Sequence, residues 1–224
     1  MIEVRDVSHS YGDRMALRSV SVTLTERRVA VIGANGSGKS TFARLLNGLV
    51  VPDHGEVSVH GLSTRSDAAA VRRTVGFVFT DPDAQIVMPT VAEDVAFGLR
   101  RYKFDKDQTR RRVFAALTEM GLEIFADHPA HLLSSGQKQL LALCSVLVTE
   151  PQVLVCDEPT TLLDRRNTRR VLEILDRLPQ QVVLVTHDLD SVAGYDRVLV
   201  FDEGQLVADD QPTVAVDHYR ALVG

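Results

Sequence analysis

The chain has 224 residues, a formal net charge of −5 and 45% hydrophobic residues, which suits one α/β domain with room for a small inserted subdomain. The acidic balance argues against a nucleic-acid-binding protein, because contacts with phosphates need a basic surface. Charged residues interrupt the N-terminus and the longest apolar stretch is short, so we expect no signal peptide, no membrane span and a cytoplasmic protein. Cys144 and Cys156 lie in apolar segments, which predicts buried free thiols.

The first thirty residues have the pattern of antiparallel β-structure. Val20, Val22 and Leu24 alternate with polar residues, which is typical of a half-buried strand. Residues 55–61 are expected to form another short strand bounded by turn residues. We therefore expect a β subdomain at the N-terminus.

A glycine-rich loop follows the apolar run 28–32, which predicts a buried parallel strand. Phe42, Leu45, Leu46 and Leu49 are expected on one face of the helix after the loop. The glycines let successive N–H groups turn toward an anion, a lysine can reach the terminal phosphates, and a serine hydroxyl can bind Mg²⁺. The predicted nucleotide-binding residues are Gly33, Asn35, Gly36, Ser37, Gly38, Lys39, Ser40 and Thr41.

The next part of the chain, from about residue 83 to 150, has a helical pattern. Val113, Leu117 and Met120 share a face that ends at Gly121, a typical helix C-terminus. We expect residues 80–150 to form a helical subdomain inserted into an α/β core of 1–79 and 151–224.

A second anion-binding loop is predicted at the start of a strongly apolar helix. It comprises Ser134, Ser135, Gly136 and Gln137, which follow Leu133. One γ-phosphate does not need two such loops on one chain. Two chains arranged head to tail would explain both, each offering its second loop to the nucleotide of the other.

The parallel-sheet pattern returns after Pro151. Buried strands are expected at 153–156 and 182–185, a helix carrying Val171, Leu172 and Leu175 between them, a hairpin at 198–207 and a last helix around 213–222. Asp157 follows the first of these strands, where open α/β sheets bind ligands, and suits Mg²⁺ held opposite Ser40. Glu158 comes next and can polarise the water that attacks the γ-phosphate.

Arginines cluster at 110–112, 165–166 and 169–170. They suit either a nucleic-acid-binding stripe or the solvated faces of two helices beside acidic neighbours. The net charge favours the solvated faces, so we expect no nucleic-acid partner.

Together these motifs resemble the ATP-binding subunits of ABC transporters over the full length of the chain. The resemblance implies a P-loop NTPase (RecA-like) fold, a Walker A loop at 33–41, a Walker B motif at 153–158 and a signature motif at 133–137. It further implies that Tyr11 stacks on adenine, that His187 is the switch histidine acting in catalysis with Glu158 and Lys39, and that Asp164 belongs to the D-loop. Ser134, Ser135, Gly136, Gln137 and Asp164 would then contact ATP across a dimer.

Residues 78–85 and 91–98 are similar to the Q-loop region of ATPases that energise energy-coupling factor (ECF) importers of vitamins and transition metals, most of all the biotin-importer group. The implied cofactors are ATP and Mg²⁺. The implied partners are a second ATPase chain, a transmembrane coupling protein and a small membrane substrate-binding protein. The membrane partners would contact the chain near Thr80, Gln85 and 91–98, at the cytoplasmic face of the membrane.

Two positions depart from the family pattern. Thr80 stands where a glutamine usually contacts Mg²⁺, so Thr80 is a further candidate metal ligand with shorter reach. Ser135 replaces the second glycine of the signature motif. We expect a competent ATPase, with Gln85 facing the membrane partner. An exporter ATPase and a soluble ABC-type clamp in DNA repair or translation remain as alternatives, whereas a P-loop kinase or GTPase leaves 133–137 and His187 unexplained.

Overall fold

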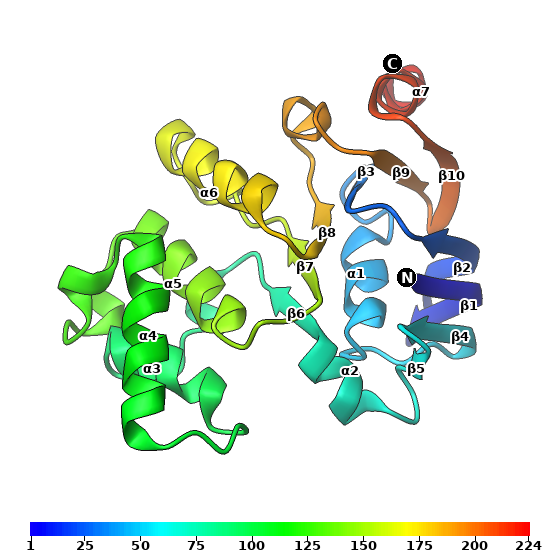
Figure 1. Ribbon diagram of the computed structural model, residues 1–224. Helices are drawn as coiled ribbons and strands as arrows, with labels where there is room; N and C mark the ends of the chain where they lie inside the picture. The colour runs from blue at the N-terminus through cyan, green and yellow to red at the C-terminus, as the bar shows by residue number, and fades with distance from the viewer. The chain divides into compact units, whose positions relative to one another are not determined.

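A computed structural model describes all residues, 1–224, and divides them into two compact units. The first, called here the core unit, comprises residues 1–76, 152–158 and 178–224. The second, the helical unit, comprises 77–151 and 159–177. Residues 159–177 thus group with the helical unit, whereas the sequence interpretation assigned them to the core. Figure 1 labels the elements of both units, which are described separately.

The core unit contains most of the strands. Its elements are β1 (Ile2–Tyr11), β2 (Arg14–Leu24), β3 (Arg28–Gly33), α1 (Lys39–Leu46), β4 (His54–Val59), β5 (Leu62–Ser63), α2 (Ala68–Thr74), β7 (Val153–Asp157), β8 (Gln181–Val185), η4 (Leu189–Val192), β9 (Arg197–Asp202), β10 (Gln205–Asp210) and α7 (Pro212–Val223). β6 (Val75–Val78) runs across the boundary between the units.

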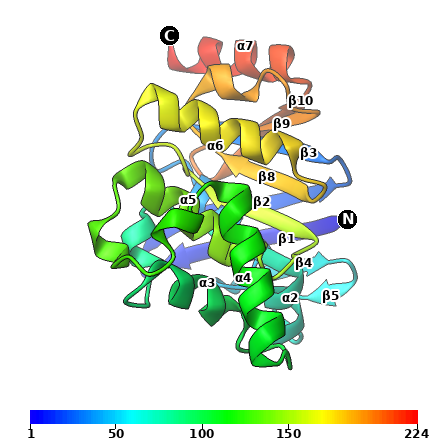
Figure 2. The same cartoon turned by 60° about the vertical axis from the view of Figure 1, so that its left-hand side comes forward.

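These strands form two sheets, with the orders β2-β1-β4-β5 and β10-β9-β3-β8-β7-β6. The first is antiparallel, as predicted, and Val20, Val22 and Leu24 are buried at alternate positions. In the second, β3 runs parallel to its neighbours β8 and β9, and β7 runs parallel to β8 (Figure 2). Helix α1 packs against strands of both sheets, with the rings of Phe42 and Phe201 4.9 Å apart. The predicted α/β P-loop fold is confirmed.

The helix after the glycine-rich loop is shorter than expected. Phe42, Leu45 and Leu46 are buried as predicted, but Leu49 lies beyond the helix and is 45% exposed, so its assignment to the buried face is wrong. The helix ends because Asn47 caps it and uses its side-chain amide to donate to Val75 O at 2.8 Å. This tertiary contact turns the chain away from the helical path.

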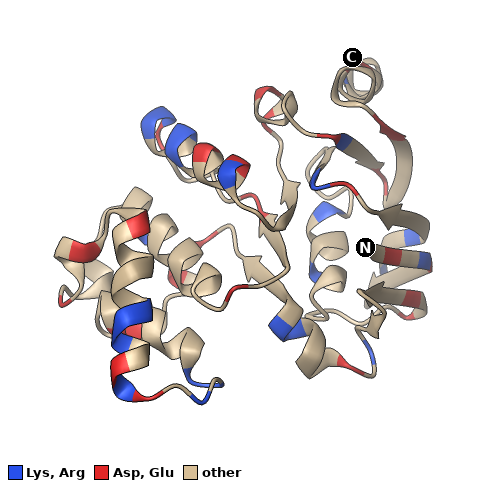
Figure 3. Cartoon of the chain, in the orientation of Figure 1, with Lys and Arg blue, Asp and Glu red and all other residues tan.

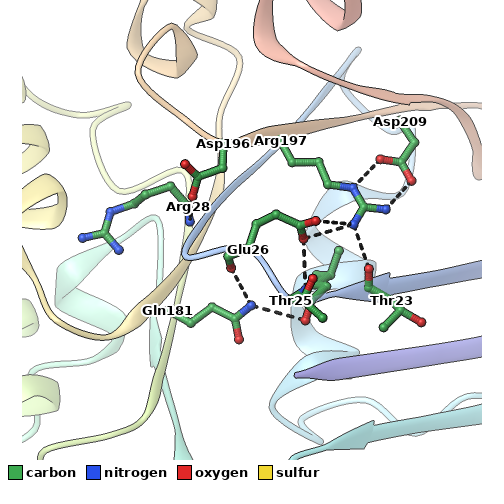
Figure 4. A network of polar contacts seen from close by, with 9 residues as sticks. Thr23, Thr25, Glu26, Arg28, Gln181, Asp196, Arg197 and Asp209 are labelled. Atoms are coloured by element: carbon green, nitrogen blue, oxygen red, sulfur yellow. Dashed lines mark hydrogen bonds and ion pairs between the residues drawn. The ribbon is translucent and has the colours of Figure 1, made fainter.

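An ion-pair network on Arg197 joins β9, β10 and the turn before β3 (Figure 4). Arg197 Nε and Nη2 donate to the carboxylate of Asp209 at 2.5 and 2.6 Å, and Nη1 donates to Glu26 Oε2 at 3.0 Å and to Thr23 O at 2.8 Å. The hydrogen bonds to Asp209 are the main cause of a raised Arg197 pKa. The network fixes the C-terminal hairpin to the N-terminal part of the core unit.

The helical unit is built from η1 (Pro82–Ala84), α3 (Val91–Leu99), α4 (Lys106–Met120), η2 (Glu123–Phe125), η3 (Ala130–Leu132), α5 (Ser135–Leu147) and α6 (Arg165–Arg177). Helices α3, α4 and α5 pack on one another. Val113, Leu117 and Met120 are buried on α4, and Gly121 ends it with φ 64°, as predicted. No helix has the length and apolar character needed to cross a bilayer. Cys144 and Cys156 are buried and free, as expected.

Lysine and arginine residues on α4 and α6 are interspersed with acidic residues (Figure 3). Arg112 pairs with Glu150 at 2.8 Å, and Arg169 pairs with Glu173 one helical turn away at 2.9 Å. Arg169 is 83% exposed. These pairs agree with the interpretation of the arginine clusters as solvated helix faces.

Candidate nucleotide-binding site

The phosphate loop connects β3 to α1 and requires glycine at specific positions. Gly33, Gly36 and Gly38 have φ values of 149°, 83° and 104°, a region that other residues rarely adopt. A β-carbon on Gly33 would lie 2.1 Å from Phe201 O, and one on Gly38 would lie 2.6 Å from Ala16 O. The close packing of the neighbouring backbone therefore excludes any side chain at both positions.

Backbone hydrogen bonds hold this loop from the side of the C-terminal hairpin. Gly204 N, in the turn between β9 and β10, donates to Ser37 O at 3.0 Å, and Gly204 O accepts from Arg18 N at 2.8 Å. Ser37 and Thr41 are buried, whereas Asn35 and Gly36 are exposed. The predicted loop residues therefore combine a fixed inner side with an exposed rim.

Lys39 lies inside the curl of the loop and is 5% exposed. Its ammonium donates to Gly33 O at 2.8 Å and to Ala34 O at 2.9 Å. Burial lowers the Lys39 pKa, and the charges of Glu158 and Asp157 act in the opposite direction. A cation held among backbone dipoles in this way suits the binding of a phosphate group.

Ser40 and Asp157 meet as predicted. Ser40 Oγ donates to Asp157 Oδ1 at 2.8 Å, and Arg44 Nη2 lies 3.9 Å from Oδ2. Burial raises the pKa of Asp157, while the hydrogen bond from Ser40 lowers it. A hydroxyl and a carboxylate are oxygen ligands that fit Mg²⁺. No group of three or more His, Cys, Asp or Glu that could hold a metal ion gathers there or elsewhere in the chain.

Glu158 and His187 form a hydrogen-bonded pair at the ends of β7 and β8. His187 Nδ1 and Glu158 Oε2 lie 2.5 Å apart, the carboxylate 14% and the imidazole 56% exposed. Glu158 has φ 54°, and its N–H donates to Val185 O at 3.0 Å. A left-handed non-glycine residue costs about 1 kcal/mol or more and is concentrated at functional sites. The sequence assigned the two residues separately; the direct contact between them is new.

Tyr11 stands at the end of β1 with its side chain 48% exposed, as an aromatic stacking surface requires. The ring of His9 lies edge-on against it, with the centroids 4.8 Å apart. His9 Nδ1 lies 3.4 Å from Asp53 Oδ1. His9 was missed by the sequence analysis, although two residues of separation on a strand place both rings on one face.

The signature residues begin α5 in the helical unit. Ser134 Oγ accepts from Gln137 N at 3.3 Å, and Gln137 Oε1 accepts from Ser134 N at 2.8 Å, which is a capping box. Ser135 is exposed, and a β-carbon on Gly136 would lie 2.4 Å from Asn167 Cγ. Asn167 also donates to Asp164 through its N–H at 2.8 Å. The structure thus brings the signature and D-loop residues together.

The side-chain amide of Gln85 forms hydrogen bonds within the helical unit. Its Oε1 accepts from Phe79 N and its Nε2 donates to Ala142 O, both at 3.1 Å. Its amide is therefore engaged inside the unit, which differs from the expectation that it faces a partner. Thr80 is half-buried in the same unit, while Ser40 and Asp157 belong to the core unit, so its contact with a metal ion stays a prediction.

The chain matches known proteins over nearly its whole length. The family description "ABC transporter" matches residues 17–161. A Deinococcus radiodurans protein, provisionally named an ABC transporter ATP-binding protein, is 54% identical over 220 residues, 98% of this chain and 97% of that one. The biotin transport ATP-binding protein BioM of Rhizobium etli is 45% identical over 221 residues, 99% of this chain and 98% of that one. The energy-coupling factor transporter ATP-binding protein EcfA1 of Latilactobacillus sakei is 38% identical over 220 residues, 95% of this chain and 79% of that one.

Solved structures agree with these sequence matches. The cbiO1 protein of Clostridium perfringens, part of the ABC transporter complex cbiONQ, matches with a TM-score of 0.85 and 33% identity over 99% of this chain and 92% of that one. A dimeric ATP-binding cassette in a post-hydrolysis state, bound to ADP and Pi, matches with a TM-score of 0.86 and 28% identity over 95% and 99%.

The loop, the strand-end carboxylates and these matches together identify the chain: it belongs to the ABC transporter family, as an ATPase similar to the ATP-binding subunits of the energy-coupling factor group.

Proposed function

We propose that this chain is the ATP-hydrolysing subunit of an ECF-type membrane importer, with a vitamin, biotin first, or a transition metal ion as its solute. The observation that carries the proposal is the cluster at the strand ends of the core unit. Lys39, the Ser40–Asp157 pair and the Glu158–His187 pair there supply a phosphate-binding cation, oxygen ligands and a base. The identity of 45% with BioM supports biotin as the first solute to test.

In the proposed mechanism each group of the core unit has one role. Tyr11 stacks on adenine, the N–H groups of residues 33–41 bind the phosphates, and Lys39 binds the terminal ones. Ser40 and Asp157, with Thr80 as a further candidate, would hold Mg²⁺, which shields phosphate charge when bound. Glu158 accepts a proton from the attacking water, and His187, bonded to the same carboxylate, keeps it oriented and steadies the γ-phosphate.

The proposal includes a second ATPase chain. Signature residues 134–137 and Asp164 of one copy would contact the γ-phosphate held by the other, as the head-to-tail arrangement implies. The dimeric structural relative bound to ADP and Pi supports this arrangement. Closure of the two ATPase chains around ATP would then shift the populations of the transporter's conformational states.

A hollow of about 270 Å³ in the helical unit is the proposed contact with the transmembrane coupling protein. Residues 86–89 line it with Ala130 and His131. Asp94, 4% exposed, accepts from Val87 N at 2.9 Å, from Met88 N at 3.1 Å and from Ser145 Oγ at 2.8 Å. These hydrogen bonds fix the backbone of residues 87 and 88 at the edge of the hollow, where the Val87 side chain is 61% exposed. The chain would then lie at the membrane as a peripheral subunit.

An affinity pull-down of the tagged chain from detergent-solubilised native membranes tests this proposal. The wild type is compared with Val87→Glu and with Ile124→Glu, a control at a 73% exposed position of the same unit. Recovery of a small multi-span protein together with a substrate-binding membrane protein, lost only in Val87→Glu, supports the proposal and identifies the solute. Recovery of only soluble partners or nucleic-acid machinery, in favour of the clamp alternative, or of an exporter's membrane domain would overturn it.

A further inference from the structure

We propose that Arg14 is an additional nucleotide-binding residue, whose guanidinium binds the polyphosphate at the exposed rim of the phosphate loop. The inference rests on the proposed nucleotide site and extends it. Arg14 lies outside every motif that the sequence analysis singled out.

Arg14 starts β2 directly opposite Tyr11 across a two-residue turn. Gly12 has φ 59°, the sign that a type II′ turn requires at its first central position. A β-carbon built on Gly36 would lie 2.9 Å from Arg14 Nη2. The guanidinium therefore lies directly against the exposed rim of the phosphate loop.

The backbone, and not only a flexible side chain, determines this placement. The backbone oxygen of Ala16 approaches Gly38 so closely that a β-carbon there would lie 2.6 Å from it, and the buried Leu17 side chain would lie at 2.8 Å. Arg18 N is bonded to Gly204 O, whose own N–H donates to the loop at Ser37 O. The start of β2 is thus packed on the loop, and Arg14 must emerge beside it.

The Arg14 side chain has no partner of its own, unlike that of Arg44, whose Nη2 lies 3.9 Å from Asp157 Oδ2. Among all 224 residues, none forms an ion pair or hydrogen bond with the Arg14 guanidinium, whose residue is exposed. A guanidinium offers a planar set of donors that matches phosphate oxygens in pairs. An unpaired guanidinium over a phosphate-binding loop is suited to an anionic ligand.

The hairpin would then carry two contacts at once. Tyr11 ends one strand as the adenine platform and Arg14 begins the next, so one rigid turn sets the spacing between base and phosphate contacts. The expected consequence is selection for nucleotides with more than one phosphate.

Isothermal titration with ATP, ADP and AMP at constant ionic strength tests the inference. The variants are Arg14→Ala, Arg14→Lys and the control Arg18→Ala, which removes an exposed arginine from the same strand. Arg14→Ala should weaken ATP binding about tenfold, ADP binding less and AMP binding less than about twofold. Arg14→Lys should give an intermediate value, and Arg18→Ala should leave all three unchanged. The melting temperature of Arg14→Ala should equal that of the wild type, because the side chain bonds to no other residue.

Lys39→Ala in the same series separates this inference from the proposed site. If Lys39→Ala weakens ATP binding while Arg14→Ala stays within twofold of the wild type, the role of Arg14 is overturned and the phosphate loop stands. If Arg14→Ala weakens the binding of ATP, ADP and AMP equally, the substitution acts through the adenine contact of Tyr11 and not through the phosphates. That result would also overturn the inference. An unchanged dissociation constant in Lys39→Ala would contradict the phosphate loop on which the inference rests.

Discussion

The two units hold their functional groups by different means. In the core unit Asp157 ends the fully buried strand β7 and Glu158 follows it, so the hydrogen bonds of the sheet fix both residues. In the helical unit Ser134, Gln137 and Gln85 are held by individual side-chain hydrogen bonds near the surface. Each such bond contributes about 1 kcal/mol, whereas a central strand moves only when the sheet opens. The candidate catalytic groups of the core unit are therefore fixed by the sheet, whereas the contacts of the helical unit can rearrange one at a time.

The sharpest way to break this comparison is to remove the proposed base. Glu158→Gln keeps the shape of the side chain but cannot accept the proton of water, so ATP turnover should fall at least about a hundredfold. ATP affinity and the melting temperature should change little, because the buried strand still fixes the residue. Steady-state phosphate release measures turnover, with the exposed Glu56→Gln as control. Normal turnover in Glu158→Gln would remove the base from the mechanism.

A smaller effect is expected from Asp94 in the helical unit. Asp94→Ala leaves two backbone N–H groups and one hydroxyl without their acceptor, which should lower the free energy of unfolding by about 2–4 kcal/mol. The amides of Val87 and Met88 should lose protection from hydrogen exchange, while ATP affinity stays at the wild-type value. Glu93→Ala, which removes only the exposed carboxylate that accepts from Thr90 N and Oγ1, should cost about 1 kcal/mol or less. Equal losses of unfolding free energy in the two variants would show that the segment at residues 87 and 88 does not depend on Asp94.

The smallest effect uses one thiol in each unit as a reporter. Burial raises the pKa of Cys144 in α5 to about 12 and raises that of Cys156 in β7 as well, so both should react slowly with alkylating reagents in the native protein at pH 8. If the helical unit opens more easily than the core unit, Cys144 should be labelled about tenfold faster than Cys156. Peptide mass spectrometry measures both rates in one sample, and faster labelling of Cys156 would reverse the comparison.

The same shifts predict how stability depends on pH. The unfolded thiols lose their protons near the ordinary value of 9.0, before the folded ones, so the free energy of unfolding should fall as the pH rises from there toward 12.

The sequence predicted best what depends on short-range pattern. The apolar run 153–156 located Asp157 and Glu158 at a strand end, and Gly121 correctly ended α4. Contacts between distant segments could not be predicted. Leu49 was misplaced because the helix ends through Asn47 bonding to Val75, 28 residues away. The internal role of Gln85 depends on Ala142, and the position of Arg14 beside Gly36 depends on the packing of Ala16 and Leu17 against Gly38.

The hydrogen bond from Gly204 to the phosphate loop has a consequence for synthesis of the protein. The loop itself is complete once residue 41 has been translated, yet β3 needs β8 and β9 on its two sides, and Ser37 needs Gly204. A nascent chain therefore carries the motif long before it has a formed pocket. ATP binding can therefore stabilise the folded core unit only after the β9–β10 hairpin has left the ribosome. Shorter nascent chains gain no such stabilisation.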